Sequence, residues 1–270
     1  MRFGICSEIF KDWKLAEAMA FARRVGYDAI EIAPFTIADY VTDISDTTRR
    51  QIRDDAARAG IAISGIHWVL VKAEGMYVNH PDSAVRARTA RYFCELVDFC
   101  ADLGGQTIVV GSPKQRNVMD GVSPEQAWDW AKHTFRDAVK HAGERGITIC
   151  FEPLAPSETN FINTAEEAIR FVRENESSYF RIILDVKAMC SESKAIPQII
   201  RESWPYFAYF HANDRNLKGP GFGEVQYEPI VQALREVGYD GTVSVEVFKF
   251  EEGPEAIATR SLEYLKRVFA

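Results

Sequence analysis

The chain has 270 residues, of which 47% are hydrophobic and 26% are charged. This composition is typical of a globular protein, and the length is sufficient to bury a large core as one domain over residues 1–270. The 39 acidic and 32 basic residues give a formal charge of -7 and are mixed along the chain, which argues against a nucleic-acid partner.

The amino-terminal sequence and the cysteines bear on cellular location. The first ten residues, MRFGICSEIF, lack the features of a secretory signal, and no apolar run approaches the roughly 20 residues that cross a bilayer. The five cysteines form no CxxC pair, so we interpret them as reduced core residues. We therefore expect a cytoplasmic protein without a membrane partner.

Short β-rich apolar runs alternate with amphipathic segments along the whole chain. The runs predicted as strands are 2–7, 29–33, 62–67, 106–111, 147–152, 181–185, 207–211 and 242–246. The segments predicted as helices are Lys14–Val25, Ser45–Ala59, Ser83–Leu103, Pro124–Arg145, Thr164–Glu174, Lys194–Ser203, Tyr227–Val237 and Pro254–Val268. This alternation is typical of repeated β-loop-α units around a parallel sheet.

Glycines and polar caps mark the joints between these units. The glycines that stand where a helix C-terminus requires positive φ, just before a strand, are Gly26, Gly60, Gly104, Gly146 and Gly238. The helix starts with N-cap residues are at Ser45, at Ser123 with Gln126, and at Asn163 and Thr164 with Glu166 and Glu167. An open doubly wound sheet usually has about five to seven strands, and no GxGxxG follows the first strand here. Eight units therefore predict a closed (β/α)₈ TIM barrel.

Four consecutive predicted strands end in residues that bind metals. In a TIM barrel the C-terminal ends of the strands build the site. Strands five to eight end in Glu152, Asp185, His211 and Glu246. Side chains alternate along a strand with a period of two, so these four are expected to face the barrel interior together with the residues two positions earlier, Cys150, Ile183, Tyr209 and Ser244.

The convergence of three carboxylates and one imidazole predicts a bound divalent cation. Unpaired carboxylates in one barrel mouth repel one another, and a cation is the simplest way to hold them together. Oxygen and nitrogen ligands without a thiolate suit Mn²⁺, Mg²⁺ or Co²⁺, with Zn²⁺ as a further candidate. Each residue alone has an ordinary structural explanation as a loop cap or a core histidine. Four at equivalent points of successive units favour a metal site.

The motifs TICFEP, IILDV, AYFHAND and VSVEV resemble those of the xylose isomerase-like TIM barrels, and within them the D-tagatose and D-psicose 3-epimerase branch. The resemblance extends from the opening FGIC to the closing SLEYL. It implies that Glu152, Asp185, His211 and Glu246 bind the metal. It also implies that Glu152 and Glu246 are the catalytic acid and base of an isomerase that transfers a proton next to a sugar carbonyl through a metal-stabilised enediolate.

The resemblance implies two substrate-binding residues and shows one departure. Glu158, in EPLAPSE, and Arg215, in HANDR, match substrate-binding positions of the family. The alternatives are an exposed loop acid for Glu158 and a surface arginine paired with Asp214 for Arg215. Three residues after Asp185 the family carries a substrate-binding histidine, whereas this chain has Ala188. The neighbouring Lys187 is either a replacement donor or a solvated lysine.

The first half of the chain supplies weaker candidates. Glu31 lies near the end of strand two, and His67 and Trp68 end strand three, so they are expected to line the barrel mouth. The indole offers an apolar wall to the C–H face of a sugar. Lys114 and Arg116 follow strand four, where they form either a solvated loop or a grip on a phosphorylated or carboxylated substrate.

Several other functions share these features. Inosose dehydratase, 3-dehydroshikimate dehydratase and hydroxypyruvate isomerase use one metal in the same barrel and begin with the same proton removal. The DNA-repair endonuclease branch uses three metals and many more histidines than the five present here. A non-catalytic barrel that binds metal or sugar is the remaining alternative, and Ala188 is its only sequence hint. We expect a small sugar or keto-polyol substrate, and the resemblance implies a homo-oligomer.

Overall fold

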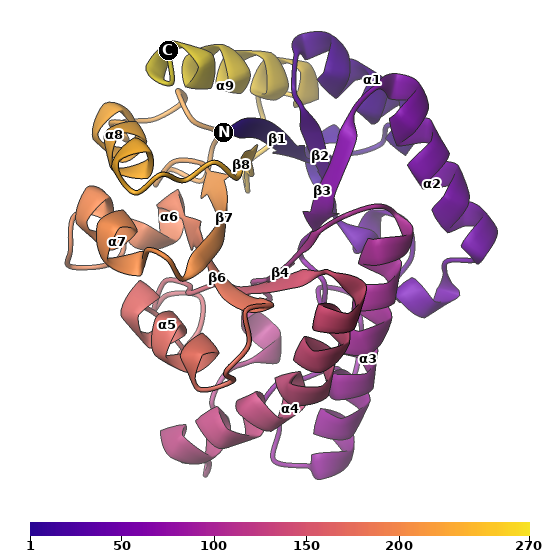
Figure 1. Ribbon diagram of the computed structural model, residues 1–270, viewed down its shortest axis with the longest axis vertical. Coiled ribbons are helices and arrows are strands. Elements are labelled where there is room, and N and C mark those ends of the chain that lie inside the picture. Colours follow the sequence, from indigo (N-terminus) through magenta and orange to yellow (C-terminus); the bar gives the residue numbers. More distant parts are fainter.

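Eight parallel strands close into a barrel in which each strand pairs with its neighbours in sequence and β1 pairs with β8 (Figure 1). The computed structural model describes residues 1–270. The strands are β1 (Arg2–Cys6), β2 (Ala29–Ile32), β3 (Ala62–Ile66), β4 (Thr107–Val110), β5 (Thr148–Phe151), β6 (Phe180–Asp185), β7 (Phe207–Ala212) and β8 (Thr242–Val245). The predicted TIM barrel is confirmed. No strand limit differs from the predicted one by more than one residue.

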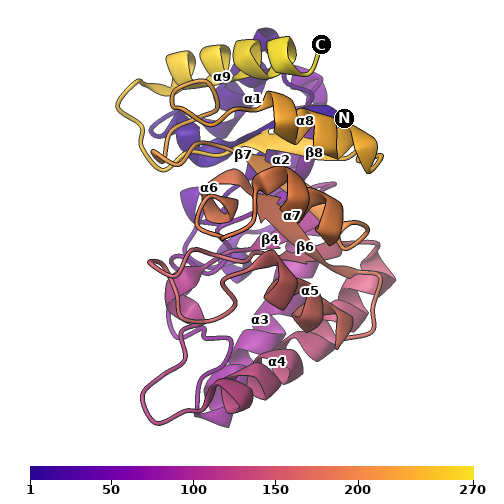
Figure 2. The ribbon, with the colours of Figure 1, turned by 90° about the vertical axis from the view of Figure 1, so that its left-hand side faces the viewer.

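Helices surround the barrel on its outside, as the two perpendicular views show (Figures 1 and 2). They are α1 (Leu15–Val25), α2 (Asp46–Ala59), α3 (Ser83–Asp102), α4 (Pro124–Arg145), α5 (Ala165–Arg173), α6 (Val186–Met189), α7 (Ile196–Ser203), α8 (Glu228–Glu236) and α9 (Pro254–Val268). The single turn α6 was not predicted, and neither were the short 3-10 helices at Ser7–Phe10, Pro34–Thr36, Val41–Asp43 and Pro113–Gln115. Segments this short show no helical periodicity in the sequence. None of the helices has both the length and the apolar character needed to cross a membrane.

The predicted caps form the helix ends. Gly60 and Gly146 end α2 and α4 with φ of 69° and 68°, a conformation that is strained for residues with a Cβ atom. The Ser123 side chain accepts a hydrogen bond from the Gln126 backbone N–H, and the Gln126 side chain accepts one from the Ser123 N–H. These two bonds form the predicted capping box and fix where α4 begins.

The strands place apolar layers inside and outside the barrel wall. The inward side chains of Val109, Cys150, Ile183 and Tyr209 form a small separate cluster in the barrel interior. Outside the wall, Phe135 of α4 packs its ring 4.6 Å from Phe93 of α3 and 5.2 Å from Phe180 of β6. Burial of one such side chain contributes about 1.5–3 kcal/mol, so these layers hold helices and barrel together.

The two ends of the barrel differ in character. The chain termini lie close together near the N-terminal end of β1 (Figures 1 and 2), where the Phe3 and Phe269 rings meet at 5.3 Å. At the opposite end, the strands deliver ionisable side chains to the interior. The ionisable groups therefore gather at the C-terminal ends of the strands.

All five cysteines are free, as predicted, although Cys94 and Cys190 are half-buried and only the other three are fully in the core.

Candidate metal centre and active site

The residues that close strands five to eight meet at one point. One ligand atom from each of Glu152, Asp185, His211 and Glu246 lies within 4.8 Å of the others, and all four side chains are buried. The strands β5 and β8 end one residue before the two glutamates, yet the pairing continues: Glu152 N–H donates to the Val110 carbonyl at 3.1 Å. The expected convergence of these four side chains is therefore present.

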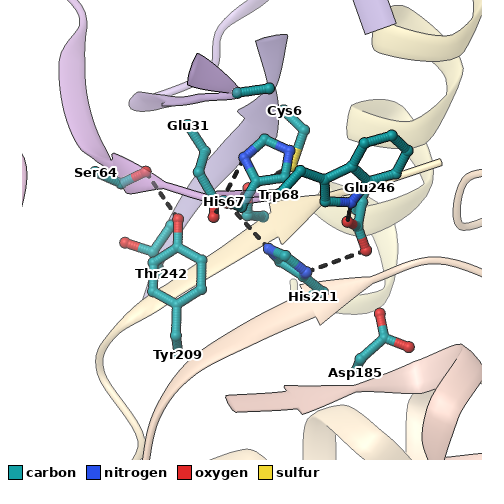
Figure 3. A network of polar contacts seen from close by, with 12 residues as sticks. Cys6, Glu31, Ser64, His67, Trp68, Asp185, Tyr209, His211, Thr242 and Glu246 are labelled. Carbon is teal, nitrogen blue, oxygen red and sulfur yellow. Dashed lines mark hydrogen bonds and ion pairs between the residues drawn. The ribbon is translucent and has the colours of Figure 1, made fainter. Parts of the chain in front are cut away.

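The donor set fits a divalent cation. His211 Nδ1 and Glu246 Oε2 face each other as an ion pair at 3.1 Å (Figure 3), and neither buried atom has a hydrogen-bond partner besides this contact. Buried polar atoms are normally satisfied, so two ligand atoms that contact only each other and converge with two further carboxylates are typical of metal ligands. Three carboxylates with one imidazole form the kind of oxygen-rich set that Mg²⁺ and Mn²⁺ accept.

Without a cation, the environment separates the proton affinities of the two glutamates. Burial raises the pKa of Glu152 to about 8, and the charges of Glu246 and Asp185 add to this effect. Burial also acts on Glu246, but the neighbouring His211 imidazole outweighs it and lowers the pKa of Glu246. One carboxyl group therefore holds its proton near neutral pH while the other is ionised, which is a pattern of acid and base pairs.

Glu31 orients the imidazole of His211. Its Oε2 atom accepts a hydrogen bond from His211 Nε2 at 3.0 Å, and the side chain is 1% exposed (Figure 3). Burial would raise the pKa of Glu31, but His211 and His67 lower it to about 2. The ionised carboxylate keeps the proton on Nε2, so Nδ1 is free to face the cluster.

His67 lies beneath the cavity and does not line it. The ring has no exposed surface, its Nε2 is 2.8 Å from Glu8 Oε2, and its Nδ1 is 3.7 Å from Glu31 Oε1. The sequence-based expectation that His67 and Glu31 line the mouth is wrong, because both point inward from β3 and β2 as a second layer. His67 thus supports Glu31, which in turn supports His211.

Trp68 forms a wall of the site. It is stacked between Phe35 and Phe248, at ring distances of 5.7 and 5.8 Å, and its Nε1 donates to Glu246 Oε1 at 2.8 Å (Figure 3). Its φ is +52°, an uncommon value for a bulky residue. The indole therefore offers an apolar face and also fixes the glutamate oxygen that does not face His211.

A cavity of about 270 Å³ opens above the cluster. Its wall includes Trp68, Glu152, Glu158, Lys187, Glu246 and Phe248. A neighbouring cavity of about 460 Å³ shares Glu158, Lys187 and Phe248 and also reaches Arg215. A larger cavity of about 950 Å³ between α7 and the segment after β7 contains none of the four cluster residues. The cavity of about 270 Å³ is thus the one that gives access to residues of the cluster.

The remaining candidates fall into different places. Glu158 borders the cavity, whereas Arg215 is exposed and donates to the Cys190 carbonyl at 3.1 Å. The alternative pairing of Arg215 with Asp214 is absent, because Asp214 accepts from the Val225 N–H instead. Arg215 lines the neighbouring cavity and the larger one but not the cavity above the cluster.

The basic pair after β4 is divided by the structure. Lys114 borders the cavity, but Arg116 is 1% exposed and its Nη1 donates to the Glu152 carbonyl at 2.7 Å. Both sequence-based readings of Arg116, a solvated residue or a substrate grip, are therefore wrong, since the guanidinium holds the backbone of β5. Asn213 was not predicted either. Its Nδ2 donates to Asp185 Oδ2, and its Oδ1 accepts from the Lys187 N–H. No periodic pattern in the sequence marks Arg116 or Asn213.

Comparisons with known proteins agree with this barrel fold. A D-psicose 3-epimerase of Agrobacterium fabrum is 28% identical over 228 residues, which cover 83% of this chain and 76% of the relative. The crystal structure of the D-psicose 3-epimerase of Clostridium cellulolyticum with D-tagatose superposes with a TM-score of 0.87 at 22% identity, covering 100% of this chain and 99% of the other.

A further relative acts at a different carbon. The 3-dehydro-D-guloside 4-epimerase of Escherichia coli is 20% identical over 273 residues, which cover 98% of this chain and 99% of the relative. Residues 19–268, nearly the whole chain, match the family described as xylose isomerase-like TIM barrel. The chain therefore belongs to the xylose isomerase-like TIM barrel family.

Proposed function

We propose that the chain is a divalent-metal-dependent sugar epimerase that moves a proton on a carbon next to a carbonyl group. The observation that carries this proposal is the meeting of Glu152, Asp185, His211 and Glu246 below a small cavity. The two glutamates of this set have pKa values displaced in opposite directions. The names of the relatives, which are 3-epimerases and a 4-epimerase of sugars, support it.

The four clustered residues would hold the cation, with Mn²⁺, Mg²⁺ or Co²⁺ favoured by the donor atoms and Zn²⁺ as a further candidate. When bound, the cation would polarise the substrate carbonyl and thereby acidify the neighbouring C–H bond. Glu31 keeps the Nδ1 lone pair of His211 directed at this point, and Arg116 fixes the backbone that carries Glu152. These contacts pre-organise the site before substrate arrives.

Proton transfer falls to the two glutamates. In the first half-reaction, the ionised Glu246 removes the proton from one face of the carbon, and the planar enediolate forms. In the second, Glu152 delivers to the opposite face a proton that it takes up from solvent, which inverts the configuration. One turnover leaves the substrate proton on Glu246, and its release to solvent restores the starting state, so proton count and charge balance over the cycle.

The cavity favours a small polyhydroxylated substrate. Trp68 and Phe248 present apolar surface to the C–H groups of a sugar, while Glu158 accepts hydrogen bonds from its hydroxyl groups. The 4-epimerase relative makes a 3-keto-glycoside a second candidate class besides a free ketose. Both classes need the same proton transfer, at different carbons.

The test is solvent deuterium incorporation into D-psicose, D-tagatose, L-ribulose and a 3-keto-glucoside, with the protein loaded with Mn²⁺ or chelated. We expect incorporation that requires metal. Glu246→Gln should lower the rate by at least about 100-fold, which is the usual contribution of a positioned acid or base. Glu263→Gln, an exposed residue of α9, is the matched control and should leave the rate unchanged.

The labelled carbon separates the alternatives. Deuterium at C3 of a ketose supports 3-epimerisation, and deuterium at C4 of the keto-glucoside supports 4-epimerisation. Loss of water from the product would assign a dehydratase instead. A metal-loaded protein that incorporates no deuterium into any of these compounds would contradict the proposed function.

A further inference from the structure

Lys187 is a buried lysine next to the candidate metal site. It lies on α6, one turn of helix directly after Asp185, and its side chain is only 8% exposed. Lysines are almost never buried without a partner, because an ammonium group loses hydration there. Its backbone N–H donates to Asn213 Oδ1 at 2.7 Å, so the turn that carries it is fixed.

The ammonium group of Lys187 belongs to the wall of the metal-site cavity. Its Nζ donates to Glu158 Oε1 at 2.8 Å and stands 4.1 Å from the ring centre of Phe248. Glu158, Phe248 and Lys187 all line the cavity that also contains Glu152 and Glu246. An ammonium has three N–H donors, and Glu158 uses one of them. The others are left for a molecule in the cavity.

The neighbouring residue cannot supply such a donor. Ala188 occupies the position three residues after Asp185, and its backbone N–H is engaged with Asp185 Oδ1 at 2.7 Å. Its side chain is a methyl group. Of the residues of α6, Lys187 is therefore the one that offers a side-chain donor to the cavity.

We infer that Lys187 binds the substrate oxygen on which negative charge develops when the proton leaves the neighbouring carbon. This inference rests on the proposed epimerase function and names a residue that contributes to it. A buried ammonium is a strong partner for an anionic oxygen, because charge-assisted hydrogen bonds are about twice as strong as neutral ones. Glu158 holds Nζ in place, and Phe248 excludes water from one side of it.

The test compares three variants of the Mn²⁺-loaded protein on the substrate that the wild type labels with deuterium. Lys187→Ala is expected to lower kcat by about 100-fold to 1,000-fold, which is the usual loss on removing one donor to a developing oxyanion. Lys187→Arg should keep more activity than Lys187→Ala. Lys194→Ala, which removes an exposed lysine from an ion pair with Glu202, is the matched control and should leave kcat unchanged.

Chemical rescue separates a donor from a structural prop. Ethylammonium should raise the kcat of Lys187→Ala at least tenfold. Tetramethylammonium, which carries a charge but has no N–H, should leave it unchanged. The inference is overturned if Lys187→Ala keeps its rate within about threefold of the wild type. It is equally overturned if the rate falls and ethylammonium fails to rescue it, since Lys187 would then only position Glu158.

The two proposals fail in different ways. A wild-type protein that labels no substrate contradicts the proposed function itself. A wild-type protein that labels its substrate, together with an unaffected or unrescued Lys187→Ala variant, leaves the function standing and removes only the role of Lys187.

Discussion

Glu31 carries no predicted chemistry of its own, yet it decides how His211 is presented. The contact between Glu31 Oε2 and His211 Nε2 is 3.0 Å long and completely shielded from solvent. Carboxylates that accept from the outer nitrogen of a ligand histidine fix its tautomer and increase its basicity. His67 and Glu8 extend this chain behind Glu31, so the histidine is held by a series of buried contacts.

Glu31→Gln should weaken metal binding by about 10-fold to 100-fold, because the amide removes the charge that stabilises the Nε2–H tautomer. Competition with a chromophoric chelator measures the affinity for Mn²⁺. Glu17→Gln, on the exposed side of α1, is the control and should bind metal like the wild type. Unchanged affinity in Glu31→Gln would show that the ring of His211 is held by other contacts.

The sequence was informative about residues that end regular elements. Glu152, Asp185, His211 and Glu246 each close an apolar run, so the barrel topology alone brings them together. Lys187, Arg116 and Asn213 lie in a single helical turn or in loops, where no periodicity tells which way a side chain points. The burial of these side chains depends on how neighbouring loops fold over the strand ends. For this reason the sequence suggested only two roles for Arg116, a solvated loop residue or a residue that binds the substrate.

At the scale of elements, helix limits followed from local chemistry. The limits of α4 and α9 are those predicted, because Ser123, Pro124 and Pro254 mark the starts. The shorter α7 begins at Ile196 and not at Lys194, and Pro197 stands in its first turn. Proline in the first turn is a start signal, so the sequence did mark this later start, which the prediction placed two residues too early.

Ser123→Ala should lower the free energy of unfolding by about 1 kcal/mol, because it leaves the Gln126 N–H without its cap. For a chain of this size the melting temperature should fall by roughly 2–4 °C. Ser178→Ala, an exposed serine outside any helix, is the matched control. A melting temperature equal to that of the wild type would indicate that water replaces the cap at no cost.

At the scale of the whole molecule, the barrel separates an apolar body from a charged mouth. The interior cluster of Val109, Cys150, Ile183 and Tyr209 lies below the metal-binding residues and carries no charge. The carboxylates therefore ionise next to an apolar interior of low dielectric constant, and their repulsion must be relieved by protons or by a cation. Stability of the metal-free protein should accordingly depend on pH.

The sign of that dependence follows from Glu152. Its pKa of about 8 in the folded chain exceeds the ordinary value of 4.5, so the folded state binds a proton that the unfolded state has lost. The stabilisation is complete below pH 4.5 and is lost as the pH rises through 8. Between pH 6 and pH 8 the ionisation of Glu152 alone should lower the free energy of unfolding of the metal-free protein by roughly 2 kcal/mol. Burial acts in the same direction on Asp185, whose pKa is also raised.

We therefore expect the melting temperature of chelated protein to fall between pH 6 and pH 8, and the gain on adding Mn²⁺ to be larger at pH 8. A cation replaces the proton on Glu152, so binding competes with protonation at pH 6 and does so less at pH 8. Thermal unfolding at both pH values, with and without metal, measures both effects. Glu152→Gln cannot ionise and should show a smaller pH dependence, with the remainder due to Asp185, His67 and His211, whose pKa values are also raised. If chelated wild-type protein instead became more stable from pH 6 to pH 8, Glu152 would already be ionised at pH 6, and its assignment as the proton-holding member of the pair would be wrong.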